Sequence, residues 1–320
     1  MAKRVRDTSS DYTTSKEAPS QSSRAPERWS VKNWVSFLNE RAPPVAYILL
    51  SFFPAVSGLK LAEGFVDFEK LGWGTTGLLL LFVILRIMDD VKDYETDKIC
   101  HPDRPIPRGS MSYDEVCKVI SVLPLLLLTF TGALAWRYNY TIAVVYFICA
   151  FYLYMMYLEF GIGEVLSKSP LIYAITHELI LYFLTMFVLT LGGRPWNDLL
   201  VLEMGSIVLS AFFTYEVCRK LDPTHLKIKG TYLVIYGRVY TFIIALVLAT
   251  IGAYNSYLLK CHMFTWPVEG ILIISLLALF LYMPSKYPLN TKPKAHKPVE
   301  AVAVLYLLVH FIAPFAATFL

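Results

Sequence analysis

Residues 78–97 decide the fold: they read Leu-Leu-Leu-Leu-Phe-Val-Ile-Leu-Arg-Ile-Met and then Asp-Asp-Val-Lys-Asp-Tyr-Glu-Thr-Asp. The apolar half is typical of a membrane-spanning helix, and four aspartates follow where it ends. Positions i, i+4 and i+8 of a helix lie near one face, so we expect Asp89, Asp93 and Asp97 to form a carboxylate stripe. With Asp90 beside them, these residues supply the hard oxygen ligands that suit Mg²⁺ bridging to a phosphorylated substrate. The alternative is a solvated acidic helix end, which the helix dipole disfavours.

The rest of the chain has the composition of a polytopic membrane protein. Of its 320 residues, 56% are hydrophobic, and the mean hydropathy is +0.51. Nine apolar runs are each long enough to cross roughly 30 Å of hydrocarbon as a helix, which a soluble domain does not require. We therefore predict an all-α fold of nine transmembrane helices, with spans near residues 44–66, 73–91, 116–136, 139–158, 170–192, 198–218, 232–256, 264–284 and 299–319.

The positions of Lys and Arg predict the orientation in the membrane. If the N-terminus is cytosolic, 23 of the 29 basic residues lie on the cytosolic side, five lie outside and Arg86 lies within a span. Such an imbalance predicts a cytosolic N-terminus and a C-terminus on the opposite side. The composition of the N-terminal tail favours the endoplasmic reticulum membrane. The net charge of +4 then describes a basic cytosolic face, suited to anionic lipid or an anionic substrate.

The chain divides into a tail and one membrane domain. Residues 1–28 are rich in Ser, Thr and charge, so we expect a disordered cytosolic tail, and residues 29–320 form the catalytic domain with its nine spans. Residues 29–40 carry tryptophans and resemble a short interfacial helix. Loops 92–115 and 219–231 are long, polar and on the same side, so they can share a site. No segment is long enough for a separate nucleic-acid-binding fold, and the five cysteines have no disulfide or zinc spacing.

The acidic run and the element after it resemble the UbiA superfamily of intramembrane prenyltransferases. The first motif of that family reads N-D-x-x-D-x-x-x-D, and here Asp89 replaces the leading Asn. Arg104-Pro105-Ile106-Pro107-Arg108-Gly109 matches the R-P-L-x-S/R-G element of the family. The resemblance covers roughly residues 40–320. It implies helices bundled around a central apolar cavity, Mg²⁺ as the cofactor and an isoprenyl diphosphate as the substrate.

The second motif of the family, a D-x-x-x-D pattern at the end of the sixth span, is altered in this chain. Only Glu216 and Asp222 supply carboxylates, and six residues separate them, so a helix would place them on different faces. We retain both as candidate metal ligands. Arg219 and Lys220 stand between them, and their positive charges could replace part of a second metal site by neutralising phosphate oxygens. The alternative is that these cations only mark the cytosolic side.

Further candidates are basic, tyrosine and intramembrane ionisable residues. Ionisable groups at membrane depth usually face a cavity or a partner, so His177 and Glu159 are candidate proton acceptors, against a purely structural role for each. Arg86 is expected either to pair with an aspartate or to reach the diphosphate. The full set of expected substrate-binding residues comprises Arg86, Lys92, Arg104, Arg108, Tyr215, Glu216, Arg219, Lys220 and Tyr232.

Three functions remain open from the sequence. In each of the first two, Mg²⁺ and basic residues stabilise the departing diphosphate of a farnesyl or geranylgeranyl diphosphate, leaving an allylic cation. Capture of the cation within its own chain gives a terpene cyclase, which the altered motifs favour. Capture by an aromatic or quinone-precursor acceptor gives a prenyltransferase. A transporter or scaffold without catalysis is the third possibility, but it leaves the acidic run beside Arg-Pro without a purpose.

Overall fold

The computed structural model describes residues 30–221, 231–283 and 295–319, so Asp222 and most of loop 219–231 lie outside the described residues. Within these ranges the chain is helical and contains no strand. Nine segments of the described chain are long and apolar enough to span a membrane, which confirms the expected fold class and number of spans. They are α2 (Pro44–Glu63), α3 (Phe68–Lys92), α5 (Tyr113–Arg137), α6 (Tyr140–Tyr157), α8 (Pro170–Glu178) continued by α9 (Ile180–Leu191), α10 (Leu199–Arg219), α11 (Tyr232–Leu258), α12 (His262–Tyr282) and α13 (Lys297–Ala317).

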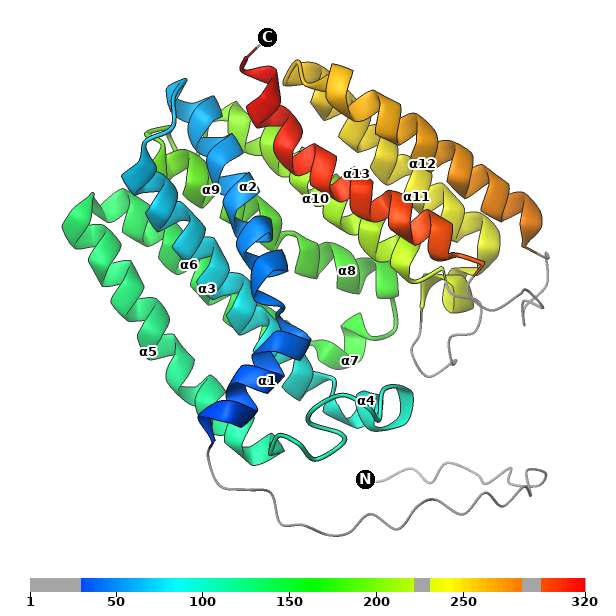
Figure 1. Cartoon of the computed structure of the whole chain (residues 1–320), viewed down its shortest axis with the longest axis horizontal. Helices are drawn as coiled ribbons and strands as arrows, with labels where there is room; N and C mark the ends of the chain where they lie inside the picture. The colour runs from blue at the N-terminus through cyan, green and yellow to red at the C-terminus, as the bar shows by residue number, and fades with distance from the viewer. Residues whose placement is uncertain (1–29, 222–230, 284–294, 320) are drawn as a thin grey trace.

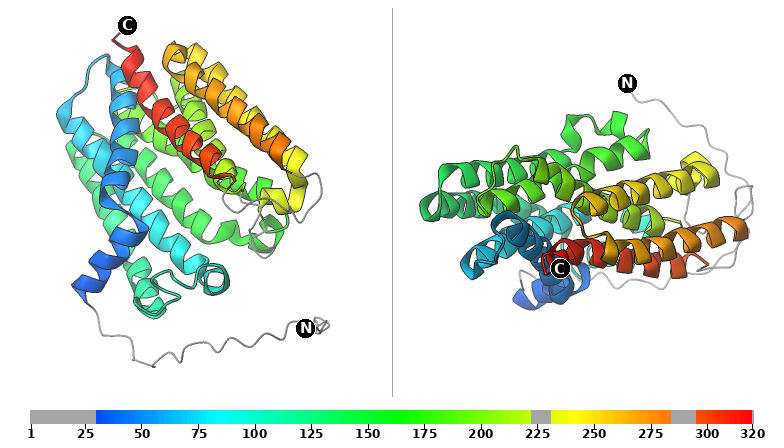
Figure 2. Two further views of the ribbon diagram at one scale, coloured as in Figure 1. Left: turned by 45° about the vertical axis from the view of Figure 1, so that its right-hand side comes forward. Right: turned by 90° about the horizontal axis from the view of Figure 1, so that it is seen from above.

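The helices pack as one bundle with two sides. Helices α2, α3, α6 and α9 pack against one another on one side, with α5 against α3 and α6 at the edge. Helices α10, α11, α12 and α13 form the other side. Contacts of α13 with α2 and of α10 with α9 join the two sides, and Figure 2 shows α13 in red beside α2 in blue. Most of the buried side chains are apolar and belong to one continuous core.

The acidic run marks one end of the bundle, which we call the motif end. The short elements α1 (Val31–Arg41), α4 (Tyr94–Cys100), η1 (Glu159–Gly161) and α7 (Gly163–Leu166) gather there, and α1 and α4 are seen at the bottom of Figure 1. The C-terminal end of α13 lies at the opposite, far end. Helix α1 occupies the segment expected to be an interfacial helix, so the chain enters at one end and finishes at the other. Which end faces the cytosol stays a prediction.

Side-chain caps fix where three of the spans begin at the far end. Asp67, Asn139 and Asp198 precede α3, α6 and α10, and each accepts a backbone N–H of the first turn at 2.8 to 3.1 Å. Such caps satisfy donors that a helix leaves unpaired at its start. They set the register of the helices, and therefore which residues reach the motif end.

A narrow apolar cavity lies between the two sides of the bundle. It is lined by Pro54, Leu78, Phe82, Leu181, Leu184, Thr185, Val188, Met204, Val208, Phe212 and Phe311. These residues come from α2, α3, α9, α10 and α13. Little of the space is wide enough for a water molecule. The central apolar cavity expected from the resemblance is therefore present, but a long hydrocarbon chain could enter it only if the side chains of its wall moved apart.

Candidate functional site

Three helices each place one carboxylate between the cavity and the motif end. Asp89 follows the cavity residue Phe82 by seven residues along α3, which is about two turns on the same face. Glu216 follows Phe212 by one turn of α10, and Glu178 precedes Leu181 by about one turn where α8 meets α9. The charges of Asp89 and Glu216 act on each other, and Glu178 is within reach of both. The convergence of α3, α8 and α10 therefore gathers three acid groups between the cavity and the motif end, a region we call the cavity entrance.

Asp93 extends this group at the end of α3. Asp93 is the C-cap residue of α3, where the chain turns into α4. Its backbone N–H still donates to the Asp89 carbonyl oxygen at 2.9 Å. Partial desolvation and the neighbouring charge of Asp89 raise the pKa of Asp93, whose side chain still reaches solvent, to about 6. A carboxyl group with a raised pKa beside a second carboxylate is typical of a site that binds a cation.

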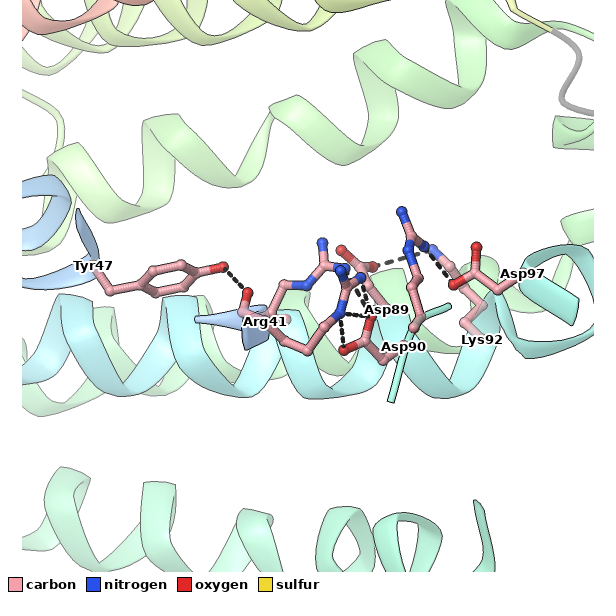
Figure 3. Close-up of polar contacts among 8 residues, drawn as sticks. Arg41, Tyr47, Asp89, Asp90, Lys92 and Asp97 are labelled. Carbon is pink, nitrogen blue, oxygen red and sulfur yellow. Dashed lines mark hydrogen bonds and ion pairs between the residues drawn. The ribbon is translucent and has the colours of Figure 1, made fainter. Parts of the chain in front are cut away.

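Asp90 follows Asp89 on α3 but is held by two arginines, of which Figure 3 labels Arg41. Its carboxylate accepts from Arg41 Nε and Nη2 at 2.6 to 3.0 Å and from Arg86 Nη2 at 2.7 Å. Arg41 is the last residue of α1, and the Asp90 side chain is only 5% exposed. Asp90 therefore ties α1 to α3, and of the two expectations for Arg86 the structure shows the pairing with an aspartate.

Asp97 is also occupied by an arginine. It lies on α4 rather than on α3, is 4% exposed, and forms a short ion pair with Arg104. The expected stripe of three aspartates on one continuous helix is thus interrupted, because the helix ends at Asp93 and restarts at Tyr94. A small polar pocket between α1 and the segment after α4 is lined by Arg41, Asp90, Asp97, Arg104, Pro105, Ile106 and Pro107. The acidic run therefore has two faces, one toward the cavity entrance and one toward arginines.

Lys92 connects the acidic run to α8. Its Nζ lies 3.7 Å from Asp89 Oδ1 and donates to the Tyr173 hydroxyl at 2.8 Å. The Tyr173 hydroxyl in turn donates to Glu159 Oε1 at 3.3 Å. Glu159 lies just after α6 with φ 50°, a left-handed conformation that is uncommon for a residue other than glycine. Glu159 therefore takes part in a hydrogen-bonded chain that fixes Lys92.

His177 lies beside this chain, stacked on the Tyr173 ring with 4.0 Å between ring centroids. Its Nδ1 is 2.8 Å from the Tyr173 carbonyl oxygen, which can only accept, so Nδ1 carries a hydrogen. In the neutral ring Nε2 then keeps a free lone pair, and this atom is buried without a hydrogen-bond partner. His177 does not line the cavity, so its role as a proton acceptor stays a prediction.

The cations of the altered second motif surround Glu216. Its carboxylate pairs with Arg219 Nη2 at 2.6 Å and with Lys220 Nζ at 2.5 Å. Lys220 Nζ also lies 5.5 Å from the centre of the buried Tyr232 ring. Tyr215 is half-buried near the charges of Arg219 and Glu216. The structure therefore brings Glu216, Arg219, Lys220 and Tyr232 together near Glu178, whereas Tyr215 lies toward Glu300 and Lys297 of α13.

Arg108 is placed outside this group. It forms an exposed pair with Glu40 of α1 at 2.7 Å and donates to the Asp103 carbonyl at 3.0 Å. The same pairing lowers the pKa of Glu40. Arg108 therefore contributes to the attachment of α1.

The donor set at the cavity entrance fits a hard divalent cation. Asp89, Asp93, Glu178 and Glu216 offer only carboxylate oxygens, which Mg²⁺ prefers. As placed, no three His, Cys, Asp or Glu side chains among residues 30–221, 231–283 and 295–319 are close enough together to hold a metal ion. Like charges around one opening repel, and a bound cation would draw them together. The residues therefore fit Mg²⁺ by their chemistry.

Three residues of the site received no role from the sequence. Arg41 lies 49 residues from its partner Asp90, so no local spacing connects them. Tyr173 is one of 21 tyrosines, and only its contacts with Lys92 and His177 distinguish it. Glu178 follows His177 directly. It could have been predicted as a site residue, because an acidic residue inside an apolar span usually has a function.

Comparison with known proteins agrees with this geometry. The sequence profile of the UbiA prenyltransferase family matches residues 51–309. A search of curated proteins finds no match. A solved structure from work on a digeranylgeranylglyceryl phosphate synthase in membranes is similar, with a TM-score of 0.58 and 16% identity over 90% of this chain and 99% of that one.

A second solved structure is a UbiA homologue from Archaeoglobus fulgidus bound to GPP and Mg²⁺. It has a TM-score of 0.51 and 12% identity over 90% of this chain and 100% of that one. At these identities the two structures support the fold alone, whereas the profile match extends over most of the chain. The protein therefore belongs to the UbiA prenyltransferase family.

Proposed function

We propose that the protein is a Mg²⁺-dependent intramembrane enzyme that ionises an isoprenyl diphosphate at the motif end. The observation that carries the proposal is the meeting of acid groups and cations at the entrance of an apolar cavity. The substrate has the complementary form, with a charged head and a long apolar tail. The similarity to a homologue bound to GPP and Mg²⁺ supports this choice.

Asp89, Asp93 and Glu178 would hold the metal, whereas both oxygens of Glu216 already pair with Arg219 and Lys220. When bound, Mg²⁺ supplies positive charge that stabilises the departing diphosphate. Lys92, Arg219 and Lys220 would donate hydrogen bonds to phosphate oxygens once the diphosphate displaces their present partners Asp89 and Glu216, and such charge-assisted bonds are the strong ones. Arg86 pairs with Asp90, and Arg104 pairs with Asp97. These two arginines therefore hold the acidic run in place and do not bind the diphosphate themselves.

The walls of the cavity protect the cation that remains. They exclude water, which would otherwise capture it. Three phenylalanine rings form a row across the cavity. The centroid of the Phe212 ring lies 6.3 Å from that of Phe82 and 5.5 Å from that of Phe311. The π faces of such rings stabilise positive charge.

We infer that the cation is captured within its own chain, so that the enzyme is a terpene cyclase. Among residues 30–221, 231–283 and 295–319, Thr185 is the one polar residue that lines the cavity, which leaves few partners for the polar groups of an aromatic or quinone-precursor acceptor. In the cyclase, the C–O bond breaks with both electrons leaving on the diphosphate, a C–C bond forms, and the cyclic cation loses a proton. His177 Nε2 is the candidate acceptor of that proton. The prenyltransferase stays the alternative.

Product analysis tests the proposal. Purified protein receives farnesyl or geranylgeranyl diphosphate with Mg²⁺ and no acceptor, and extracts are examined by mass spectrometry. A cyclic hydrocarbon or alcohol with release of diphosphate supports the cyclase. Turnover only after an aromatic acceptor is added would assign the prenyltransferase instead. Binding of labelled diphosphate that does not depend on Mg²⁺, without turnover, would favour a transporter or scaffold.

We also propose that the motif end faces the cytosol, in the endoplasmic reticulum membrane, as the distribution of basic residues predicts. Glycosylation acceptor sites introduced into the α2–α3 connection and the α3–α5 connection test this. Modification only in the first connection is expected.

A further inference from the structure

The apolar cavity has a deep end, away from the acid groups at its entrance. Helix α3 runs toward the motif end, so its lining residue Leu78 lies one turn deeper than Phe82. Along α9, which runs the other way, the lining ends at Val188, and along α10 it begins at Met204. Both of these side chains are buried. We call Val188 and Met204 the floor of the cavity.

Helix α2 lies directly behind the floor. A Cβ at Gly58 of α2 would lie 2.6 Å from Val188 Cγ1 and 3.4 Å from Met204 Cε. The first of these distances is too short for two carbon atoms, so there is no room for a methyl group between the backbone of α2 and Val188. The Gly58 backbone therefore supports both floor residues from behind, and neither can retreat toward α2.

Beyond the floor the helices pack too closely to extend the cavity. A Cβ at Gly192, the residue after α9, would lie 2.5 Å from Ala62 Cβ of α2. A Cβ at Gly74 of α3 would lie 3.6 Å from Ala55 Cβ of α2. Helix α2 thus meets both neighbours through glycine and alanine, so backbone bounds this region. Rotation of the Leu and Phe side chains in the wall can widen the cavity, but it cannot deepen it.

The depth of the cavity follows from the helices that form it. On α3, on α8 with α9, and on α10, an acid residue at the entrance is separated by ten to twelve positions from the deepest lining residue. These pairs are Asp89 and Leu78, Glu178 and Val188, and Glu216 and Met204. At the rise of an α-helix, such separations span about 15–18 Å. The three helices therefore agree on the distance from the acid groups to the floor.

Isoprenyl chains differ in length by fixed steps, because each isoprene unit adds four carbon–carbon bonds to the main chain. With bonds of about 1.5 Å, an extended farnesyl chain measures about 14 Å and an extended geranylgeranyl chain about 19 Å. The farnesyl chain fits between the acid groups and the floor, extended or bent. The geranylgeranyl chain exceeds this depth when extended, and a folded one would need a much wider cavity.

We propose that Val188 and Met204, supported by Gly58, set the length of the isoprenoid chain, and that the substrate is farnesyl diphosphate. The inference rests on the proposed function, because it takes the isoprenyl tail to occupy the cavity while the diphosphate lies at the entrance. It adds to that function the residues that distinguish one isoprenyl diphosphate from another.

The floor selects by exclusion. Lipid is as apolar as the cavity, so a longer tail gains little affinity when it moves from the bilayer into the protein. A tail that meets the floor too early, however, holds its diphosphate short of Asp89 and Asp93, and a small misplacement of the reacting bond lowers the rate strongly. The longer substrate should therefore lose turnover more than it loses binding.

The rates of diphosphate release from farnesyl and geranylgeranyl diphosphate provide the first test. They are measured separately with the full chain in lipid nanodiscs and Mg²⁺. The wild type should release diphosphate from the farnesyl substrate at least about tenfold faster than from the geranylgeranyl substrate. Equal rates, or a faster reaction of the longer substrate, would overturn the proposal.

Val188→Ala tests the floor itself. It removes the methyl groups that lie against Gly58, so the ratio of geranylgeranyl to farnesyl turnover should rise several-fold. Val145→Ala is the matched control, since it makes the same change at a buried residue of α6 outside the cavity lining, and it should keep the wild-type ratio. An unchanged ratio in folded Val188→Ala would contradict the proposal.

A methyl group added from behind should restore the floor. In the double variant Gly58→Ala with Val188→Ala, the new Cβ takes the place of the missing Val188 Cγ1 and lies 3.4 Å from Met204 Cε, which is ordinary van der Waals contact. The ratio of the two rates should therefore return toward the wild-type value. A ratio that stays at the value of Val188→Ala would count against Gly58 as the support of the floor.

Photo-crosslinking of the wild type needs neither a variant nor turnover. A farnesyl thiodiphosphate with a diazirine at the end of its tail should label the peptides that contain Val188 or Met204, as mass spectrometry can show. Labelling of other helices instead would overturn the proposal, even if farnesyl diphosphate is turned over. Labelling of the floor without release of diphosphate from farnesyl diphosphate would support the floor and contradict the proposed function, so the two failures are distinguishable.

Discussion

Neighbouring aspartates of one acidic run have different surroundings in this protein. Asp89 lies beside Lys92 and Glu216 near the cavity entrance, whereas Asp90, the next residue, is enclosed by Arg41 and Arg86. Successive residues of a helix point about 100° apart, so one turn of α3 serves two faces. The same division separates Asp93 from Asp97. Acidic residues in one motif can therefore have two roles, metal binding on one face and attachment of α1 and the following segment on the other.

The largest effect is expected on the face of the cavity entrance. Asp93→Ala, and equally Asp89→Ala, should lower turnover of farnesyl or geranylgeranyl diphosphate by at least about 100-fold, because the charge on the departing diphosphate would lose its counter-charge. The polar, half-exposed setting of these residues should leave the protein folded. Turnover is measured by product formation and folding by circular dichroism. Activity retained in Asp93→Ala would count heavily against the assignment.

On the opposite face the expected effect is on stability. Asp90→Asn leaves two arginines without their carboxylate, and breaking a buried pair of this kind costs about 3–5 kcal/mol. Thermal unfolding in nanodiscs measures the loss. The double variant Asp90→Asn with Arg41→Gln should lose less than the sum of the single variants. Additive losses would show that the two side chains do not interact.

Acid should weaken Mg²⁺ binding on the first face only. The pKa of Asp93 is raised to about 6, so its carboxylate is present above that pH and becomes protonated below it. Apparent Mg²⁺ affinity should therefore fall as the pH drops through about 6. The pKa of Asp93 in the folded protein exceeds its ordinary value of 3.8, so between pH 3.8 and about 6 the folded protein binds this proton more tightly than the unfolded chain does. The free energy of unfolding therefore decreases as the pH rises through this range. Titrations of Mg²⁺ with diphosphate analogue at several pH values measure the first effect, and an affinity that is flat across this window would contradict the role of Asp93.

A smaller change in activity is expected from substitution of His177, which lies near Lys92. His177→Ala should alter the distribution of products more than the rate of diphosphate release, because the proton is lost after ionisation. Gas chromatography with mass spectrometry and a diphosphate assay separate the two quantities. An unaltered product profile would leave His177 with a packing role against Tyr173.

The smallest effect is expected at the edge of the second face. Arg108→Gln removes an exposed pair with Glu40, and such pairs contribute about 0.2–1 kcal/mol. Turnover should stay at the wild-type level. A large loss of turnover would place Arg108 at the diphosphate after all.

The sequence predicted the spans and the acidic run because hydropathy and spacing are local properties. The positive-inside pattern also predicted that loops 92–115 and 219–231 lie on one side; residues 222–230 of the second loop lie outside the described residues, so for that loop this stays a prediction. The division of the run into two faces was not predictable, because it depends on Arg41 in α1 and on the interruption of the helix at Asp93. Likewise Glu178 was noticed only as the neighbour of His177, and its place beside Asp89 depends on how α8 packs against α10.

Electron paramagnetic resonance of Mn²⁺, used in place of Mg²⁺ with a farnesyl thiodiphosphate that does not ionise readily, tests the division of the acidic run most directly. The wild type and a folded Asp90→Asn sample should both bind the ion in the presence of the analogue. Asp89→Asn should lose this binding. Retention in Asp89→Asn together with loss in Asp90→Asn would reverse the two faces and contradict the proposed site.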